Sequence, residues 1–182
     1  MRQKPPNDPT TAPQQIVLAA VLQVRERILQ ALLWQRAREP YSGDWALAGG
    51  RLATDETLEG SIRRQLAAKV DVREVAHLEQ LGTWSEPDRH PRHRELATAF
   101  LGLVPADVDP ELPADTAWHV VDDLPSLAFD HAEIVLAARE RLRGKLSYTN
   151  VGFALAPATF TLSPSCATST RPHSGTTSRR RT

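Results

Sequence analysis

A short stretch rich in arginine and histidine, residues 89–94, carries the side chains best suited to binding phosphate. Arg89, Arg92 and Arg94 alternate there with His90 and His93. Guanidinium groups match phosphate oxygens in planar, forked pairs. The stretch is therefore either a clamp on the diphosphate of a ligand or a solvated loop. We expect no metal site at the two histidines, because no carboxylate or thiolate stands at ligand spacing.

Other side chains capable of chemistry also have a structural interpretation. Asp122 and Asp123 could supply a general base or a replacement metal ligand, although such a pair before a proline commonly solvates a turn. His131 could contact a ligand at the start of a helix, or be a structural histidine. Trp84 and Trp118 could stack on an adenine, but single aromatic residues in strands are more often core.

A second group of residues at characteristic spacing begins at the double glycine Gly49-Gly50. Gly50 is separated by five residues from Glu56, which is separated by seven from Arg64, with aliphatic Leu66 and Val72 beyond. This spacing resembles the Nudix box, GX5EX7REUXEEXGU, in which U is aliphatic. The preceding Trp-Ala-Leu-Ala-Gly-Gly at 45–50 is similar to the family's W-x-L-P-G-G entry. The resemblance implies an α/β fold, the Nudix α/β/α sandwich with a mixed sheet and a strand-loop-helix.

The box departs from the family at Gln65, Ala68, Lys69 and Asp71. In the family, glutamates at the first three of these positions hold Mg²⁺ or Mn²⁺ against a diphosphate, since hard divalent ions need several anionic oxygens. The resemblance implies that Glu56 and Arg64 chiefly brace the turn. We therefore expect no catalysis and no metal from the remnant positions, which are Gly50, Glu56, Arg64, Gln65, Ala68 and Lys69.

Two downstream stretches narrow the resemblance. Residues 81–94 are similar to a segment of ADP-ribose-type Nudix proteins, and residues 127–149 resemble Nudix-related (NrtR-type) transcriptional regulators of NAD metabolism. These relatives imply an ADP-ribose-like ligand, which we assign to Arg51, Arg89, Arg92 and Arg94, and a possible homodimer. One alternative is a pyrophosphohydrolase that uses Mg²⁺ or Mn²⁺ to cleave ADP-ribose or a related nucleoside diphosphate. Another is a non-functional protein whose fold is intact but whose output domain is lost.

The hydrophobic pattern predicts the elements that must position these residues. Leu58, Ile62, Leu66 and Val70 share one face of a helix that we expect Thr54 to cap. A second helix is expected over 131–143, capped by Asp130 and ended by Gly144. Strands are predicted at 16–24 and 28–35, which form a hairpin, and at 44–50, 74–84, 96–104 and 116–121.

Composition divides the chain into unlike parts. The 182 residues carry 22 basic and 22 acidic side chains, but residues 164–182 hold four arginines and no acid, so the remainder has a net charge of −4. One cysteine excludes an intramolecular disulfide framework, and the absence of a long apolar run predicts a cytoplasmic, non-membrane protein. We expect a disordered lead-in at 1–15, a Nudix-like domain at 16–145, a winged-helix remnant at 146–163, and a disordered basic tail at 164–182. We expect the rest of the winged helix to be missing, and on this expectation DNA binding is doubtful.

Overall fold

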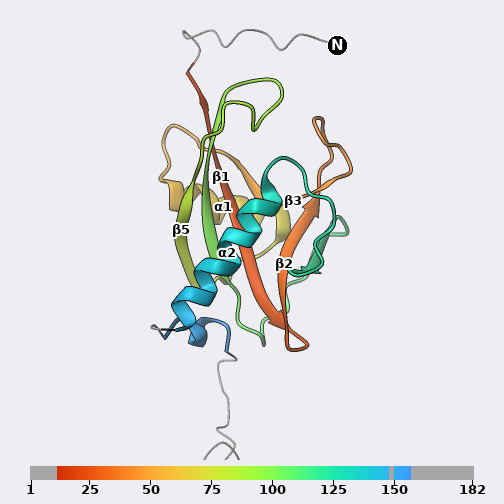
Figure 1. Ribbon diagram of the computed structural model, residues 1–182, viewed down its shortest axis with the longest axis vertical. Coiled ribbons are helices and arrows are strands. Elements are labelled where there is room, and N and C mark those ends of the chain that lie inside the picture. Colours follow the sequence, from red (N-terminus) through yellow and green to blue (C-terminus); the bar gives the residue numbers. More distant parts are fainter. Residues whose placement is uncertain (1–11, 148–149, 157–182) are drawn as a thin grey trace, which may run out of the picture.

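A mixed β-sheet forms the centre of the computed structural model, which describes residues 12–147 and 150–156 (Figure 1). Its strands are β1 (Gln14–Arg25), β2 (Ile28–Gln35), β3 (Trp45–Ala46), β4 (Ala48–Arg51), β5 (His77–Trp84), β6 (Glu95–Leu103) and β7 (Thr116–Val120). The seven-stranded sheet has the order β3-β2-β1-β6-β5, with β4 paired to β1 and β7 paired to β2. β1 and β6 run parallel, and the other pairs are antiparallel.

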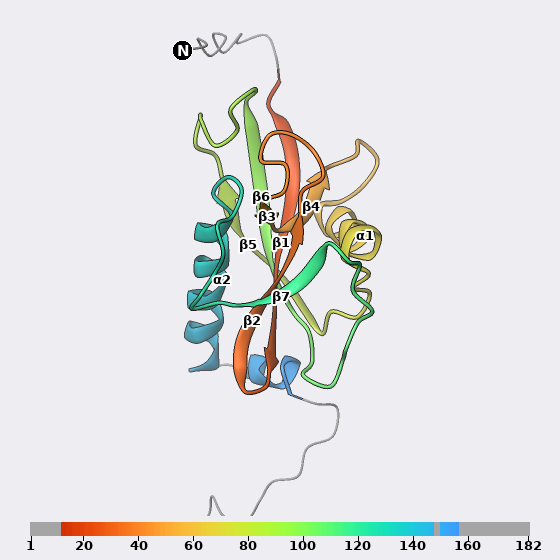
Figure 2. The ribbon, with the colours of Figure 1, turned by 90° about the vertical axis from the view of Figure 1, so that its right-hand side faces the viewer.

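Two helices cover opposite faces of this sheet, α1 (Leu58–Val70) and α2 (His131–Leu146), as Figure 2 shows. Alternate residues of β1 enter the two cores: Val17, Ala19 and Val21 pack with α1, whereas Leu18, Ala20 and Leu22 pack on the side of α2. Because both faces are buried, the strand is continuously apolar in sequence. The predicted α/β/α sandwich is therefore confirmed. A short 3-10 helix, η1 (Asn150–Ala154), follows α2.

The hairpin of β1 and β2 is confirmed, but the strand predicted at 44–50 is divided at Leu47. β3 pairs with β2, while β4 pairs with β1. The backbone groups of Leu47 bond to side chains instead of to a strand: its amide donates to Nδ1 of His131 at 3.0 Å, and its carbonyl accepts from Nε1 of Trp34 at 3.0 Å. After the division, Gly49 faces β1 at Val17 and Gly50 faces α1 at Gln65.

Two predicted helix boundaries were wrong, the N-cap of α1 and the end of α2. Thr57, not Thr54, is the N-cap of α1, and its hydroxyl accepts from the amide of Gly60 at 3.0 Å. α2 continues through Gly144 to Leu146, because an exposed glycine near a helix end is only mildly unfavourable. The predicted start of α2 is confirmed, with Asp130 as its N-cap. Asp130 makes no side-chain capping bond, because its carboxylate pairs with Arg89.

The predicted segment boundaries can be compared with the structure only between residues 12 and 156. β1 begins at Gln14, two residues before the strand expected at 16, because this end pairs with the start of β6. The predicted basic tail, the expected winged-helix start at 160–162 and residues 1–11 lie outside the described residues. None of the described helices is long and apolar enough to cross a membrane.

Candidate functional site

The turn between β4 and α1 is braced by Glu56 and Arg64. Arg64 donates from Nε to Oε2 of Glu56 at 2.9 Å and from Nη2 to Oε1 at 2.6 Å. Oε1 also accepts from the amide of Ala53 at 2.8 Å. The hydrogen bonds from Arg64, followed by that from Ala53, lower the pKa of Glu56 to about 2. The carboxylate therefore remains ionised and holds the loop, as the resemblance implies.

Gly50 of β4 lies close to α1, which runs beside this strand in Figure 2. A Cβ on Gly50 would lie 2.5 Å from Nε2 of Gln65, so only glycine fits here without displacing that side chain. In the orientation that satisfies its amide, Gln65 donates to the carbonyl of Gly49 at 3.3 Å and accepts from Arg64 at 3.1 Å. Gln65 is thus a buried link between strand and helix.

The positions that carry the metal-binding glutamates of the Nudix box do not form an anionic patch here. Gln65 is buried and neutral, Ala68 is exposed, and Lys69 is half-buried. The Lys69 ammonium donates to the carbonyl oxygen of Gly49 and lies 4.6 Å from the centroid of the Trp34 ring. A hard divalent ion prefers several oxygen ligands, with carboxylates prominent among them. These three residues therefore do not fit Mg²⁺ or Mn²⁺.

A pocket of about 160 Å³ lies beside Lys69, where β1, β2, β4 and the start of α2 meet. Its cationic lining is Arg36, Arg51 and Lys69, and its aromatic lining includes Trp34 and Phe129. The Arg36 guanidinium lies over the Phe129 ring at 4.8 Å and donates to the carbonyl of Pro40 at 2.9 Å. Burial lowers the pKa of both Arg36 and Lys69. The charges of Glu95, Asp44 and Glu39 act on Arg36 in the opposite direction and raise its pKa. The pocket thus holds two half-buried cations, Arg36 and Lys69, and one exposed cation, Arg51.

Arg89 has a different role from the expected phosphate clamp. Its side chain is only 2% exposed. It donates to the two carboxylate oxygens of Asp130 at 2.9 and 2.7 Å, and it also pairs with Glu95. Two acidic partners therefore occupy the guanidinium fork. The sequence could not show this, because Asp130 lies 41 residues away.

The other arginines predicted to bind ligand are also dispersed. Arg94 donates to the carbonyls of Ser85 and Glu86 at 2.7 and 2.9 Å, which closes its own loop. Arg92 is exposed. Of the four predicted ligand-binding arginines, Arg51 alone is among the residues that line the pocket. Arg36 was missed, since a single arginine after a strand carries no recognisable motif.

The two histidines of the basic loop do have a carboxylate beside them, contrary to the sequence argument. Ligand-type atoms of His90, His93 and Glu95 lie within 4.8 Å of one another. However, Glu95 already pairs with Arg89 and lies 3.3 Å from Nε2 of His93. Burial, followed by the charges of His93 and nearby arginines, lowers the pKa of His90 to about 4. The positive charges around His90 also oppose the binding of a metal cation. These residues therefore do not fit a metal site.

The remaining candidates have structural positions. His131 is buried and accepts from the amide of Leu47; burial lowers its pKa to about 3, so it is neutral. Trp84 and Trp118 pack against the two cores, and neither is among the residues that line the pocket. Asp122 pairs on the surface with Arg139 at 2.8 Å. Trp34, which the sequence analysis did not single out, is the tryptophan at the pocket.

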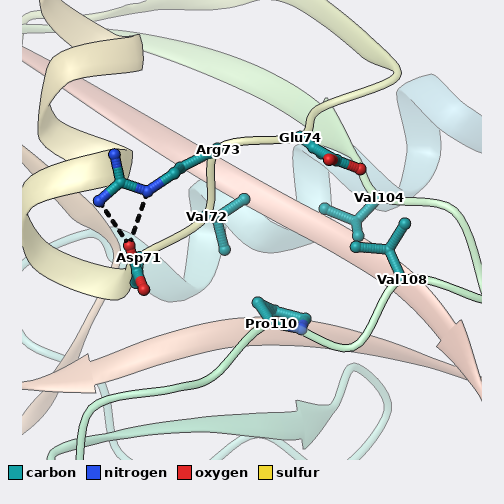
Figure 3. A pocket seen from close by; sticks show the side chains of 7 residues that line it. All are labelled: Asp71, Val72, Arg73, Glu74, Val104, Val108 and Pro110. Carbon is teal, nitrogen blue, oxygen red and sulfur yellow. Dashed lines mark hydrogen bonds and ion pairs between the residues drawn. The ribbon is translucent and has the colours of Figure 1, made fainter.

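A second pocket, of about 210 Å³, follows the C-terminal end of α1 (Figure 3). Val72, Val104 and Val108 form its apolar wall. Its charged side chains include Asp71 and Arg73, which pair with each other at 2.9 Å. It contains none of the predicted site residues, and it lacks the surplus of cations that distinguishes the pocket beside Lys69.

Comparison with known proteins identifies relatives of two kinds. The NUDIX domain model matches residues 13–138. The chain is 29% identical over 158 residues to the ADPR responsive transcriptional repressor NtrR of Acinetobacter baylyi, covering 83% of this chain and 63% of the repressor. It is 31% identical over 122 residues to the ADP-ribose pyrophosphatase of Methanocaldococcus jannaschii, covering 64% of this chain and 69% of that enzyme.

A solved structure of one of these regulators is similar to this chain in fold and sequence. The NUDIX domain of Shewanella oneidensis NrtR, crystallised with ADP ribose, superposes with a TM-score of 0.63 and 31% identity, covering 75% of this chain and 94% of that domain. The fold and the sequence therefore indicate the same set of relatives.

Proposed function

Because the chain belongs to the NUDIX domain family, we propose that it is a nucleotide-sensing domain that binds ADP-ribose or a similar nucleoside diphosphate without cleaving it. The named relatives include both an ADP-ribose-responsive repressor and an ADP-ribose pyrophosphatase. Both relatives are named for ADP-ribose, but one is named a repressor and the other a pyrophosphatase. The side chains of the pocket favour the sensor.

The observation that carries this proposal is the charge of the pocket beside Lys69. Arg36, Arg51 and Lys69 line it, and none of the three forms an ion pair with another residue in the part of the chain that the structure describes. Its one acidic lining residue, Glu95, is engaged by Arg89. Arg51 is exposed and Arg36 lies near the charges of three carboxylates, whereas Lys69 is half-buried with Arg36 and Arg64 as its charged neighbours. A partly buried cation without an ion-pair partner is unfavourable until an anion neutralises it. A diphosphate supplies that anion.

The size of the pocket also supports a phosphate subsite. Its volume of about 160 Å³ is smaller than the roughly 300–1,000 Å³ of sites that enclose a whole drug-sized ligand. We therefore place the diphosphate in the pocket and the nucleoside outside it. Trp34 and Phe129 form part of the surrounding wall.

A single experiment tests binding and cleavage together. ADP-ribose is titrated into the full chain by calorimetry, with Mg²⁺ and with EDTA, and AMP is assayed in the same samples. Binding without AMP release is the expected result. Absence of binding in both buffers would exclude the sensor, and metal-dependent AMP release at ordinary turnover would show a hydrolase.

The hydrolase is the second candidate, and the intact Glu56–Arg64 pair favours it. That pair keeps the strand-loop-helix in place, and a pyrophosphatase is among the relatives. Hydrolysis with Mg²⁺ or Mn²⁺ would require ligands from outside Gln65, Ala68 and Lys69. The AMP measurement decides between the two functions.

We also propose that the domain forms a homodimer, as its resemblance to the regulators implies. Light scattering coupled to gel filtration measures the mass directly. A mass of 20.1 kDa, that of a single chain, would exclude the dimer under those conditions.

A further inference from the structure

Lys69 occupies an unusual place at the edge of the pocket. It lies in the last turn of α1, at one of the positions where the Nudix box carries a metal-binding glutamate. Its ammonium group donates to the carbonyl oxygen of Gly49 and faces the ring of Trp34. An ammonium has three donors, so this contact leaves two available to a ligand.

The charge of Lys69 is not balanced by its surroundings. In residues 12–147 and 150–156 it has no ion-pair partner, and its charged neighbours include Arg36 and Arg64. Burial, followed by the charges of these two arginines, lowers the pKa of Lys69. The ammonium is therefore held in an environment that favours an incoming anion.

A divalent ion at the same place would meet two obstacles. It would share the Gly49 carbonyl with an ammonium group, and the side chain of Gln65 offers only a neutral oxygen in place of a carboxylate. Like charges a few ångströms apart repel strongly when partly buried. The ammonium and the metal are thus mutually exclusive.

We infer that the Lys69 ammonium replaces the divalent metal of the Nudix box, so that this site binds a diphosphate directly and without Mg²⁺ or Mn²⁺. The inference rests on the proposed function for the identity of the ligand. An ammonium carries one charge and cannot activate a bound water as a metal does. The same substitution therefore permits binding and removes the usual route to cleavage.

The test compares ADP-ribose affinity of the full chain in EDTA and in MgCl2, by calorimetry, for three proteins. The wild type should bind equally in both buffers, within about threefold. Lys69→Met keeps the length of the side chain but loses its charge, and should bind about ten- to a hundredfold more weakly. Arg63→Met, which removes an exposed cation paired with Glu59 on the same helix, should change affinity by less than about twofold. Thermal unfolding verifies that each variant is folded.

Inorganic pyrophosphate, titrated in EDTA, separates this inference from the proposed function. Pyrophosphate binding that is weakened by Lys69→Met supports the role of Lys69, even if ADP-ribose itself fails to bind. Equal affinity of wild type and Lys69→Met for pyrophosphate would overturn it. So would a tenfold or greater gain in wild-type affinity for ADP-ribose on adding Mg²⁺, or a wild type that binds neither ligand.

Discussion

Replacing Asp130 by asparagine should destabilise the protein through the buried arginine that it holds. The Asp130 carboxylate accepts two hydrogen bonds from Arg89, at 2.9 and 2.7 Å. The Arg89 side chain is 2% exposed and that of Asp130 is 15% exposed. This pair fastens the basic loop before β6 to the start of α2, so its loss affects the contact between two distant segments.

The magnitude follows from the geometry. Asparagine retains one acceptor oxygen but turns a donor amide toward the second N–H of Arg89. A hydrogen bond to a charged group contributes about 1.5–3 kcal/mol, and removing one member of a buried ion pair costs about 3–5 kcal/mol. Glu95 still compensates part of the Arg89 charge. We therefore expect the free energy of unfolding to fall by about 2–4 kcal/mol.

Urea unfolding followed by tryptophan fluorescence measures this loss. Asp122→Asn is the matched control: Asp122 also pairs with an arginine, at 2.8 Å, but is 83% exposed, so its loss should cost at most about 0.5 kcal/mol. The double variant Arg89→Met/Asp130→Asn should lose less than the sum of the single variants, because the two side chains interact. A loss below about 1 kcal/mol for Asp130→Asn would refute the argument that this ion pair anchors the loop.

Three further predictions concern the strand-loop-helix and α2. Gly49→Ala should destabilise the protein by at least about 2 kcal/mol, because the new Cβ would overlap the backbone carbonyl of Val17, which cannot rotate away. Gly144→Ala is the control, because nothing lies within 4 Å of the new atom. It should stabilise α2 by up to about 1 kcal/mol. A stable Gly49→Ala in urea unfolding would contradict the close approach of β4 and β1. The pKa of Glu56 is lowered from 4.5 to about 2, so its contribution to the free energy of unfolding is present above pH 4.5 and is lost as the pH falls toward 2. The difference in stability between wild type and Glu56→Gln should therefore shrink over that interval. A difference independent of pH would count against the brace. Restoring the box with Gln65→Glu, Ala68→Glu and Lys69→Glu should create Mn²⁺ binding detectable by electron paramagnetic resonance, and no gain over wild type would contradict the placement of this helix face.

Much of the fold could be predicted because it depends on local pattern. The apolar runs that form β1 and β2, with three polar residues between the predicted segments, identified the hairpin. The four-residue spacing of Ile62, Leu66 and Val70 identified the buried face of α1. The N-cap was misplaced because Thr54 and Thr57 are locally similar, and the choice between them depends on the loop that Glu56 and Arg64 hold.

The candidate site was only partly predictable. The spacing of Glu56 and Arg64 indicated the brace, which the structure shows. That positions 65, 68 and 69 carry no acid is a fact of the sequence, and the absence of a metal there stays a prediction. The basic loop was misleading, since Arg89 serves a buried ion pair and Arg94 closes its own loop. Arg36 and Trp34 reach the pocket from β2 and the residue after it, with no motif to mark them.

By itself, the sequence determined the sandwich, the braced strand-loop-helix and the absence of acids from positions 65, 68 and 69, because residue type and spacing along one chain segment suffice for each. The tertiary structure decided which cations share a pocket. Arg89 and Arg36 are chemically alike, but Asp130 and Glu95 neutralise the first, whereas the second lies over Phe129 with no ion-pair partner in the described chain. Which arginine forms a buried ion pair depends on contacts between residues far apart in sequence, such as Arg89 and Asp130, and residue type and spacing along one segment do not reveal them.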